Sequence, residues 1–286
     1  MKDKILVFTT LILALVFPLS FLIEKKQNSV ESYETALLNP KNEDKLQKIE
    51  IKSAGSKLVI EKNNGFFVGS NAEKTYIFPA EQKTVRNFIS ALKKIRTVSK
   101  IENSSAILNE KNYSFKISYA LEDGSSTSIL VGKTDITETK RFLMLPGKEY
   151  VFKTESDFEP YLTTIADFWV CPEIVWNFSE KPNADEIQKI SYVQKGRATT
   201  FIPSSKDFLK KTDSLLSLRH GKLAPLQDFD ENFDFLEIEF YSSAFSVKIV
   251  PAAEDYILVY KNSGMNYAAE ISSWTYSRLN EIFKEP

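Results

Sequence analysis

Histidine and cysteine are almost absent from this sequence of 286 residues, which contains one of each, His220 and Cys171. A zinc site built from several histidines or thiolates is therefore excluded, and so is the paired-histidine helix of the zinc metalloproteases. A serine-hydrolase triad would have to use His220, and no G-x-S-x-G motif accompanies it. We therefore expect a chain that is not an enzyme and has no catalytic residue, metal site or cofactor of its own.

An excess of charge of either sign is also lacking. Lysine and arginine total 37 and aspartate and glutamate total 38, which gives a formal net charge of −1. Nucleic acid is not expected as a partner, because its phosphates require a basic surface. Hydrophobic residues make up 43% of the chain and charged residues 26%, which is typical of a globular protein and excludes wholesale disorder. The length predicts one large domain or two ordinary ones.

One segment near the N-terminus lacks charge altogether. The 19 residues from Ile5 to Ile23 contain no charged side chain. A helix of this length, rising about 1.5 Å per residue, would be roughly 29 Å long and could cross the hydrocarbon core of a bilayer. We predict a membrane anchor over residues 1–26, in contact with the lipid bilayer through residues 5–23. Its large apolar side chains include Ile5, Leu6, Phe8, Leu11, Leu15, Phe17, Phe21, Leu22 and Ile23.

The anchor is predicted to remain attached as a signal anchor. The apolar run is long for a signal peptide, and no small-residue cleavage motif follows it, although a cleaved signal peptide is the alternative. Basic residues on its two sides nearly balance, so the orientation is inferred from the short leader before it. We expect a single-pass protein of the cell membrane with its C-terminal bulk on the extracytoplasmic, periplasmic side. Residues 27–45 are polar and predict a tether.

The rest of the sequence repeats one pattern of elements. Leu46-Gln47-Lys48-Ile49 matches Ile187-Gln188-Lys189-Ile190, and each opens a β-rich run that leads to an amphipathic helix, alternating strands and a terminal helix. The sequence therefore predicts an α+β fold of two tandem, internally duplicated units, residues 46–178 and 179–286. Each unit is predicted as β-β-α-β-β-β-β-α, with antiparallel sheets and packed helices. The second unit has no counterpart of residues 66–78.

The starts and faces of the helices can also be predicted. The first helix can begin at Pro79, which suits a first helical turn. The second can take Ser204 or Ser205 as its N-cap. Its apolar face is expected to contain Phe208, Leu209, Leu215, Leu216 and Leu218. The apolar face of the first helix contains Val85, Phe88, Ile89, Leu92 and Ile95.

The sole histidine and cysteine are each predicted to have a structural role. His220 lies between Arg219 and Gly221 at the predicted end of the second helix, where a basic residue caps the helix or lies at the surface. Cys171 is followed by Pro172 in an apolar run, which favours a small buried side chain over a nucleophile.

A calcium-loop spacing is present, but one of its required residues is missing. The sixth position of such a loop needs glycine for a sharp turn and is Phe233 here. A solvated acidic turn is therefore predicted in place of a calcium site. The oxygen-bearing residues with the calcium-loop spacing are Asp228, Asp230, Asn232, Asp234 and Glu239.

An aromatic run, residues 168–178, lies where the two predicted units meet. Tryptophan and phenylalanine contribute strongly both to buried packing and to binding hot spots. We therefore predict either an inter-domain surface or a partner-docking surface. Its candidate residues are Phe168, Trp169, Ile174, Trp176 and Phe178.

Several of these segments together resemble a bacterial family of unknown function. They are Ile49-Glu50-Ile51, Leu58-Val59-Ile60-Glu61, Phe66-Phe67 after Asn64-Gly65, Leu92-Lys93-Lys94-Ile95, Leu130-Val131-Gly132-Lys133, Tyr150-Val151-Phe152 and Phe168-Trp169. The chain is similar over about residues 46–178 to the family named domain of unknown function 4340 (DUF4340), which more often has tryptophan in place of Phe67. The resemblance implies a membrane-anchored extracytoplasmic protein found beside gliding-motility-type ABC transporters and their auxiliary subunits, and it implies no known activity.

The resemblance and the residues together predict a function in binding. We expect a non-catalytic, membrane-anchored binding or scaffold protein that is an accessory component of an ABC-transporter-type envelope complex, with a permease or auxiliary subunit as partner. The alternative is an envelope glycan- or lipid-binding protein that uses the cleft between its two units.

Overall fold

The structure is a computed structural model of the chain. It describes residues 37–102, 108–135, 140–145, 148, 150–155, 158–176, 183–226, 233–241, 243–252, 255–261 and 264–284. The predicted anchor and most of the predicted tether lie outside these residues. Within the part of the chain that the structure describes, no helix is both long and apolar enough to cross a membrane.

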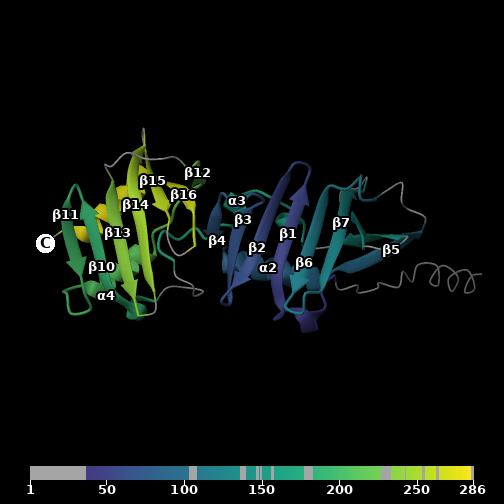
Figure 1. Cartoon of the computed structure of the whole chain (residues 1–286), viewed down its shortest axis with the longest axis horizontal. Helices are drawn as coiled ribbons and strands as arrows, with labels where there is room; N and C mark the ends of the chain where they lie inside the picture. Colours follow the sequence, from purple (N-terminus) through teal and green to yellow (C-terminus); the bar gives the residue numbers. More distant parts are fainter. Residues whose placement is uncertain are drawn as a thin grey trace, which may run out of the picture.

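The first sheet contains nine strands, and all its neighbouring strands are antiparallel. Its strand order is β4-β3-β2-β1-β6-β7-β8-β9-β5 (Figure 1). The associated helices are η1 (Pro40–Asn42), α2 (Gln82–Lys93), η2 (Glu159–Tyr161) and α3 (Ala166–Trp169). The strands are β1 (Leu46–Ser53), β2 (Ser56–Asn63), β3 (Phe66–Asn71), β4 (Ile77–Pro79), β5 (Arg96–Glu102), β6 (Phe115–Leu121), β7 (Ser126–Thr134), β8 (Arg141–Met144) and β9 (Tyr150–Glu155).

The second sheet contains seven antiparallel strands in the order β11-β10-β13-β14-β15-β16-β12. Its helices are η3 (Ala184–Glu186), α4 (Phe208–Leu216) and α5 (Ser273–Phe283). The strands are β10 (Ile187–Gln194), β11 (Arg197–Phe201), β12 (Leu223–Ala224), β13 (Asp234–Phe240), β14 (Ala244–Ala252), β15 (Asp255–Tyr260) and β16 (Tyr267–Ile271).

The two sheets have the same strand order once the hairpin β3–β4 is set aside. In each, the first strand pairs with the second on one side and with a later strand on the other, and the strand after the helix lies at the far edge. The register shifts at the same place, between Leu46 and Lys48 in β1 and between Ile187 and Lys189 in β10. Because a register shift reverses which face a side chain occupies, this shared irregularity is a specific point of similarity.

The structure adds strands to the predicted unit. β3 and β4 precede α2 in the first sheet, and one further strand follows the helix in each sheet, β5 after α2 and β12 after α4. β12 is only two residues long, too short for an alternating pattern to be recognisable in sequence. β5 begins at Arg96, three residues after α2 ends, without a glycine or proline to mark the turn.

The predicted helix starts were wrong at both positions. Pro79 ends β4, and α2 begins at Gln82, where the Glu81 carboxylate accepts a hydrogen bond from the Lys83 amide at 3.2 Å. α4 begins at Phe208, after Asp207. The predicted cap Ser205 instead accepts a hydrogen bond from the Ile202 amide at 3.0 Å and closes the preceding turn.

The predicted apolar faces are mostly confirmed. The five apolar residues predicted for the first helix are all buried. In α4, Phe208 is 3% exposed, but Leu209 is 57% exposed, which corrects the prediction for that residue. Consecutive positions on a helix point about 100° apart, and Leu209 lies on the side of α4 that faces away from the core.

The two terminal helices differ in length. α5 forms as predicted over Ser273–Phe283, with the Ser272 hydroxyl accepting a hydrogen bond from the Thr275 amide at 3.1 Å. In the first unit the chain forms only η2 and the four-residue α3. Pro160 lies in this stretch and provides no backbone N–H, so a continuous helix through it would lose a hydrogen bond and crowd the preceding turn.

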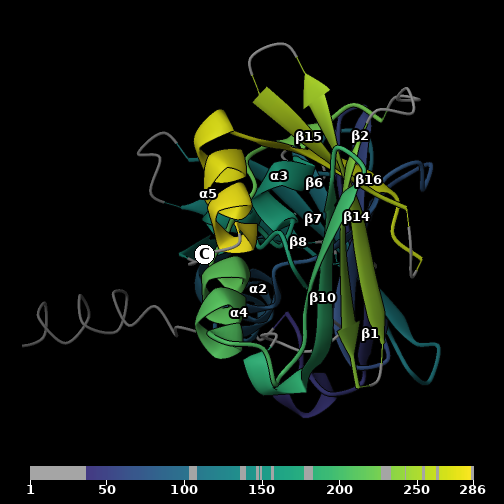
Figure 2. The same ribbon diagram turned by 90° about the vertical axis from the view of Figure 1, so that its left-hand side faces the viewer.

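The described helices cover one face of the two sheets (Figure 2), and one continuous apolar core contains side chains from both. The other face of the first sheet has cross-strand ion pairs, such as Lys48 with Glu61 at 3.2 Å and Lys57 with Glu50 at 3.0 Å. This pattern of one buried and one solvated face explains the alternation seen in the sequence. An α+β fold of antiparallel sheets with packed helices is thus confirmed.

Candidate functional site

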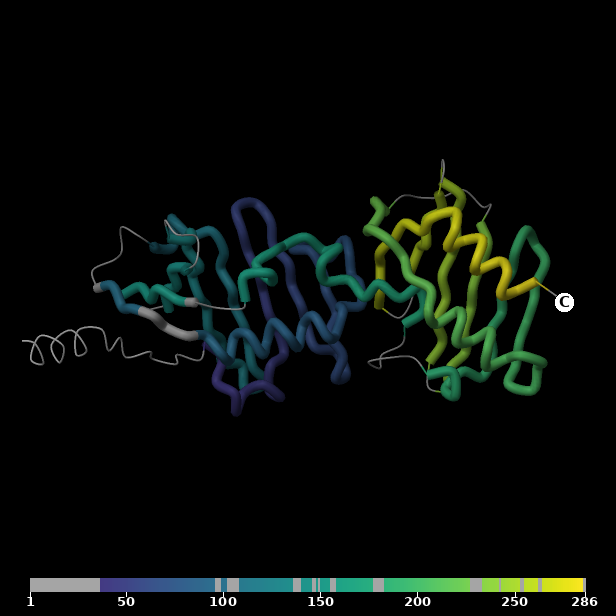
Figure 3. The backbone as a smooth tube through the Cα atoms, turned by 180° about the vertical axis from the view of Figure 1, so that it is seen from behind, coloured from purple at the N-terminus to yellow at the C-terminus, as the bar shows by residue number. Residues whose placement is uncertain are grey.

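The chain segment from the start of α3 to residue 176 lies between the two sheets. We call residues 166–176 the junction connector, and Figure 3 shows this part of the chain passing from the first sheet to the second. On the first-sheet side, its Val170 forms an antiparallel bridge with Ala80. The Cys171 amide donates to the Pro79 carbonyl at 2.8 Å, and the Glu81 amide donates to the Trp169 carbonyl at 2.7 Å.

On the second-sheet side, the junction connector pairs with the residues that follow α4. The Ile174 amide donates to the Leu218 carbonyl at 3.1 Å, and the His220 amide donates to the Pro172 carbonyl at 2.8 Å. The connector is therefore held by backbone hydrogen bonds on both sides and adds a short extended segment between the two units.

The hairpin β3–β4 makes a second connection between the sheets. Ile77 and Asn266 form an antiparallel bridge through hydrogen bonds of 2.9 and 2.8 Å. The Asn266 side-chain amide donates to the Thr75 carbonyl at 2.8 Å, and the Tyr76 hydroxyl accepts from the Leu226 amide at 3.1 Å. The hairpin that the second unit lacks is thus, together with the junction connector, a part of the first unit that contacts the second.

Stacked aromatic side chains fill the interior of the junction. The rings of Tyr260 and Tyr267 lie 4.2 Å apart and nearly parallel. The Trp176 indole N–H donates to the Tyr267 hydroxyl at 2.8 Å, and the Tyr260 hydroxyl donates to the Ile174 carbonyl at 2.9 Å. Burial raises the pKa of both tyrosines well above the ordinary value, so their hydroxyls stay protonated and serve as hydrogen-bonding groups.

The residues of the predicted docking or inter-domain surface do not share one environment. Trp169 and Ile174 are fully buried, and Trp176 is 3% exposed. Phe168 is 39% exposed, and Phe178 lies outside the described residues. The three buried side chains pack inside the molecule, so in this conformation they offer no surface to a partner.

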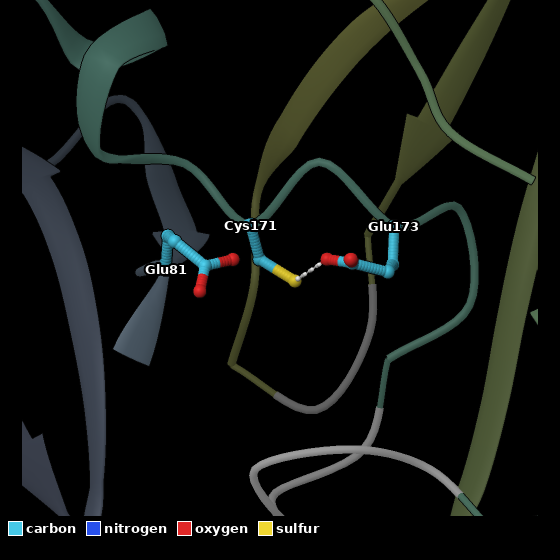
Figure 4. A group of neighbouring side chains, drawn as sticks. All are labelled: Glu81, Cys171 and Glu173. Atoms are coloured by element: carbon cyan, nitrogen blue, oxygen red, sulfur yellow. Dashed lines mark hydrogen bonds between the residues drawn. The ribbon is translucent and has the colours of Figure 1, made fainter. Parts of the chain in front are cut away.

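Three potential metal-ligand side chains meet at the junction, as Figure 4 shows. One ligand atom from each of Glu81, Cys171 and Glu173 lies within 4.8 Å of the others, the one such group among the described residues. The Cys171 thiol donates to Glu173 Oε2 at 3.1 Å, while Glu173 Oε1 lies 3.3 Å from the guanidinium of Arg219. Cys171 and Glu173 are close in sequence, but nothing in the sequence indicates that Glu81 would join them.

The chemistry of this cluster depends on the thiol. Burial, together with the neighbouring Glu173 carboxylate, raises the pKa of Cys171 far above its ordinary value. A protonated thiol is a poor nucleophile, and a metal ion would have to displace its proton before binding. Thiolate and carboxylate are both zinc ligands, so these three residues are the ones that could hold such an ion. In the structure, each already has a protein hydrogen-bond partner.

His220 lies at the centre of the junction, which corrects its predicted helix-cap or surface position. α4 ends at Leu216, and His220 is only 7% exposed. Its Nδ1 lies 2.8 Å from the Gly221 carbonyl and its Nε2 lies 2.8 Å from the Cys171 carbonyl. Both ring nitrogens thus face backbone carbonyls, and the neutral imidazole can donate its single N–H to one of them. The side chain connects the residues after α4 to the junction connector.

The stability of the protein is expected to depend on pH through this histidine. Burial lowers the pKa of His220, although the two carbonyl contacts partly oppose the shift. The unfolded chain, with an ordinary histidine pKa of about 6.5, therefore binds more protons just below that pH. Stability from this group is fully present above about pH 6.5 and decreases as the pH falls through the lowered folded-state pKa.

Denaturant unfolding at several pH values between about 7.5 and 5.5, a range that brackets the ordinary histidine pKa, measures this dependence. The chain has one histidine, so His220→Gln removes its only imidazole titration. We expect the free energy of unfolding of the wild type to fall more steeply over this range than that of His220→Gln. Parallel slopes for the two proteins would contradict the assignment.

The two described residues with calcium-loop spacing, Asp234 and Glu239, lie on opposite faces of β13. The Asp234 carboxylate is buried and accepts hydrogen bonds from the hydroxyls of Tyr192 at 3.1 Å and Tyr276 at 2.6 Å. Glu239 follows Asp234 in β13 by an odd number of residues, so its side chain lies on the opposite face of the sheet. It forms an ion pair with Lys189 at 2.6 Å. The prediction of a solvated turn is thus wrong for Asp234, while Asp228, Asp230 and Asn232 lie outside the described residues.

A comparison with protein families shows to which family the chain is related. Residues 71–227 match the family model described as Domain of unknown function (DUF4340). The chain belongs to this family. The DUF4340 match begins at the end of β3 and extends past β12, so it includes the whole junction connector and parts of both sheets. No curated protein and no solved structure matches the chain.

Proposed function

We propose that this DUF4340 protein is a membrane-anchored, extracytoplasmic binding or scaffold protein without catalytic activity. The uncharged run Ile5–Ile23 would hold the chain in the cell membrane, and the two sheets would lie on the periplasmic side. Its partner would be a permease or an auxiliary subunit of an ABC-transporter-type envelope complex.

The observation that carries the proposal is that the reactive side chains at the junction, His220 and Cys171, contact neighbouring protein groups. Both ring nitrogens of His220 contact backbone carbonyls. The Cys171 thiol, whose pKa is raised by burial, donates a hydrogen bond to Glu173. These groups connect the junction connector to its surroundings. Such an arrangement supports a binding or scaffold function, because it connects two sheets that meet edge to edge (Figure 1) into one structural unit with an extended surface.

We also propose that the body consists of two tandem copies of one unit, residues 46–178 and 179–286. The shared strand order and the shared register shift in β1 and β10 support this duplication. A duplicated, elongated body offers two similar outer faces, and an accessory protein that contacts more than one subunit of a complex needs such an extended surface.

Co-purification from solubilised membranes tests the proposal. The full chain, tagged at its C-terminus, is expected to elute together with a permease or ATPase subunit identified by mass spectrometry. A matched control is residues 1–45 fused to a soluble reporter, which keeps the predicted anchor and tether and removes both sheets. Co-elution with the full chain alone supports the proposal, whereas a full chain that elutes without any transporter subunit would count against it.

A thermal-shift screen with envelope glycans and lipids distinguishes the alternative, a glycan- or lipid-binding function, from the proposed scaffold function. A ligand that binds only the folded chain raises its melting temperature, and a scaffold without such a ligand shows no shift. A reproducible, concentration-dependent rise would favour the glycan- or lipid-binding alternative over the scaffold.

A further inference from the structure

The strand β11 forms the outer edge of the second sheet, farthest from the junction (Figure 1). Among the described residues it pairs only with β10. Ala198 and Thr200 are exposed, while Thr199 is half-buried. An edge strand of this kind presents unpaired backbone groups to which another strand can be added.

The first unit shows that a further strand can pair with the strand that corresponds to β11. Its strand β2 corresponds to β11, and β3 pairs with β2 in antiparallel register from Leu58↔Asn71 to Asn63↔Phe66. In the second unit the chain passes from β11 to α4 without forming such a strand. The shared architecture therefore has a strand position that is filled in the first unit and that no described residue fills in the second.

The turn before β11 determines which of its backbone groups point outward. Lys195 and Gly196 both have positive φ angles, of 48° and 77°, and form a two-residue hairpin loop. The residues beside such a loop, Gln194 and Arg197, form a hydrogen-bonded pair, and the pattern alternates along the strand. The N–H and C=O groups of Ala198 and Thr200 therefore point away from β10, toward solvent.

We propose that a second copy of this chain occupies this position beside β11, with the two β11 strands paired antiparallel about a two-fold axis at Thr199. Ala198 of each copy would then lie opposite Thr200 of the other, which gives about four backbone hydrogen bonds. Thr199 would face its own counterpart, a favourable cross-strand pair.

The side chains of Arg197–Phe201 suit this self-pairing. Arg197 of one copy would lie opposite Phe201 of the other, so no like charges meet across the axis. The Phe201 ring already accepts a cation, because Lys211 Nζ lies 4.0 Å from its centroid. A two-fold contact uses the same edge on both copies and closes at a dimer, whereas pairing of β11 with a different edge would continue into a filament.

The contact is small, so the dimer is expected to be weak in dilute solution. Confinement of two anchored chains to one membrane would raise their effective concentration and favour it. The dimer itself does not depend on the proposed transporter partner, because its two surfaces both belong to this chain.

Disulfide cross-linking in membranes tests the register. In a Cys171→Ala background, full-length Thr199→Cys is expected to form a covalent dimer under mild oxidation, because facing residues of a non-hydrogen-bonded pair have Cα atoms about 4.5 Å apart. Ala198→Cys alone should not cross-link, since the two introduced thiols would be offset from each other by two residues along the strands, beyond about 7 Å. Co-expression of Ala198→Cys with Thr200→Cys should restore the dimer.

Equal cross-linking of Thr199→Cys and Ala198→Cys, or a ladder of higher oligomers, would overturn the proposal. Thr200→Pro provides a second measurement, because it removes an outward N–H that the hairpin with β10 does not use. We expect the detergent-solubilised wild type to show concentration-dependent dimerisation by sedimentation and Thr200→Pro, with an unchanged circular dichroism spectrum, to remain monomeric. A wild type that is monomeric throughout, or a variant that dimerises equally, would also overturn it.

Discussion

Replacement of Trp176 by alanine is expected to lower the free energy of unfolding by about 3–5 kcal/mol, the range for removal of a buried aromatic side chain. Trp176 is 3% exposed and stacks edge-on against Phe245 at 5.7 Å. Its loss would leave a cavity at the junction and remove the donor to the Tyr267 hydroxyl. Urea unfolding of the wild type and variant, followed by circular dichroism, measures the difference.

Trp274→Ala is the matched control for this change. The Trp274 side chain is 68% exposed at the start of α5, and its ring lies 5.9 Å from the guanidinium of Arg278. We expect a loss of no more than about 1 kcal/mol, because an exposed cation–π contact contributes only about that amount. Similar losses for the two variants would show that Trp176 does not hold the junction together.

Replacement of Gln82 by leucine is expected to cost about 2–4 kcal/mol, although leucine is similar in size and more apolar. The buried amide of Gln82 accepts from the Phe67 N–H at 3.0 Å and donates to the carbonyls of Phe67 and Ala80 at 3.0 and 2.7 Å. Leucine would leave the Phe67 N–H and the Ala80 carbonyl without a partner, whereas the Phe67 carbonyl would keep the hydrogen bond from the Ala80 amide at 3.0 Å. Each buried group left unsatisfied costs about 1–3 kcal/mol.

The same substitution at Gln188 controls for the general effect of exchanging glutamine for leucine. Gln188 is exposed on β10, so we expect a change within about 0.5 kcal/mol. Hydrogen exchange adds a local measurement, because Gln82→Leu should speed exchange at Phe67, at the start of β3, more than in the second sheet. A Gln82→Leu variant as stable as the wild type would contradict the role assigned to this amide.

Local periodicity was sufficient to predict much of the fold. The helical spacing of Val85, Phe88 and Leu92 predicted the buried face of α2, and alternation predicted strands such as β13, in which Leu236 and Ile238 are buried. In each case the signal and the structure lie within the same few residues. The strands β5 and β12 could not be found in this way, because their pairing with distant edge strands defines them.

The site was predictable only in part, for the same reason. The aromatic run was recognisable as unusual, but whether its residues lie at a surface or in the interior depends on both sheets at once. His220 resembles a helix cap until the junction connector is placed beside it. The cluster of Glu81, Cys171 and Glu173 requires two segments that are far apart in sequence, and a single sequence contains no signal for that proximity.

The position of the strand after each helix has a consequence for how the protein folds during synthesis. β5 pairs with β9, and β12 pairs with β16, so each sheet can close only after its last strand has left the ribosome. The first sheet can then close while the second is still being translated. Its hairpin edge at Ile77 must wait for Asn266, so until the chain is nearly complete that edge is free for a chaperone to cover.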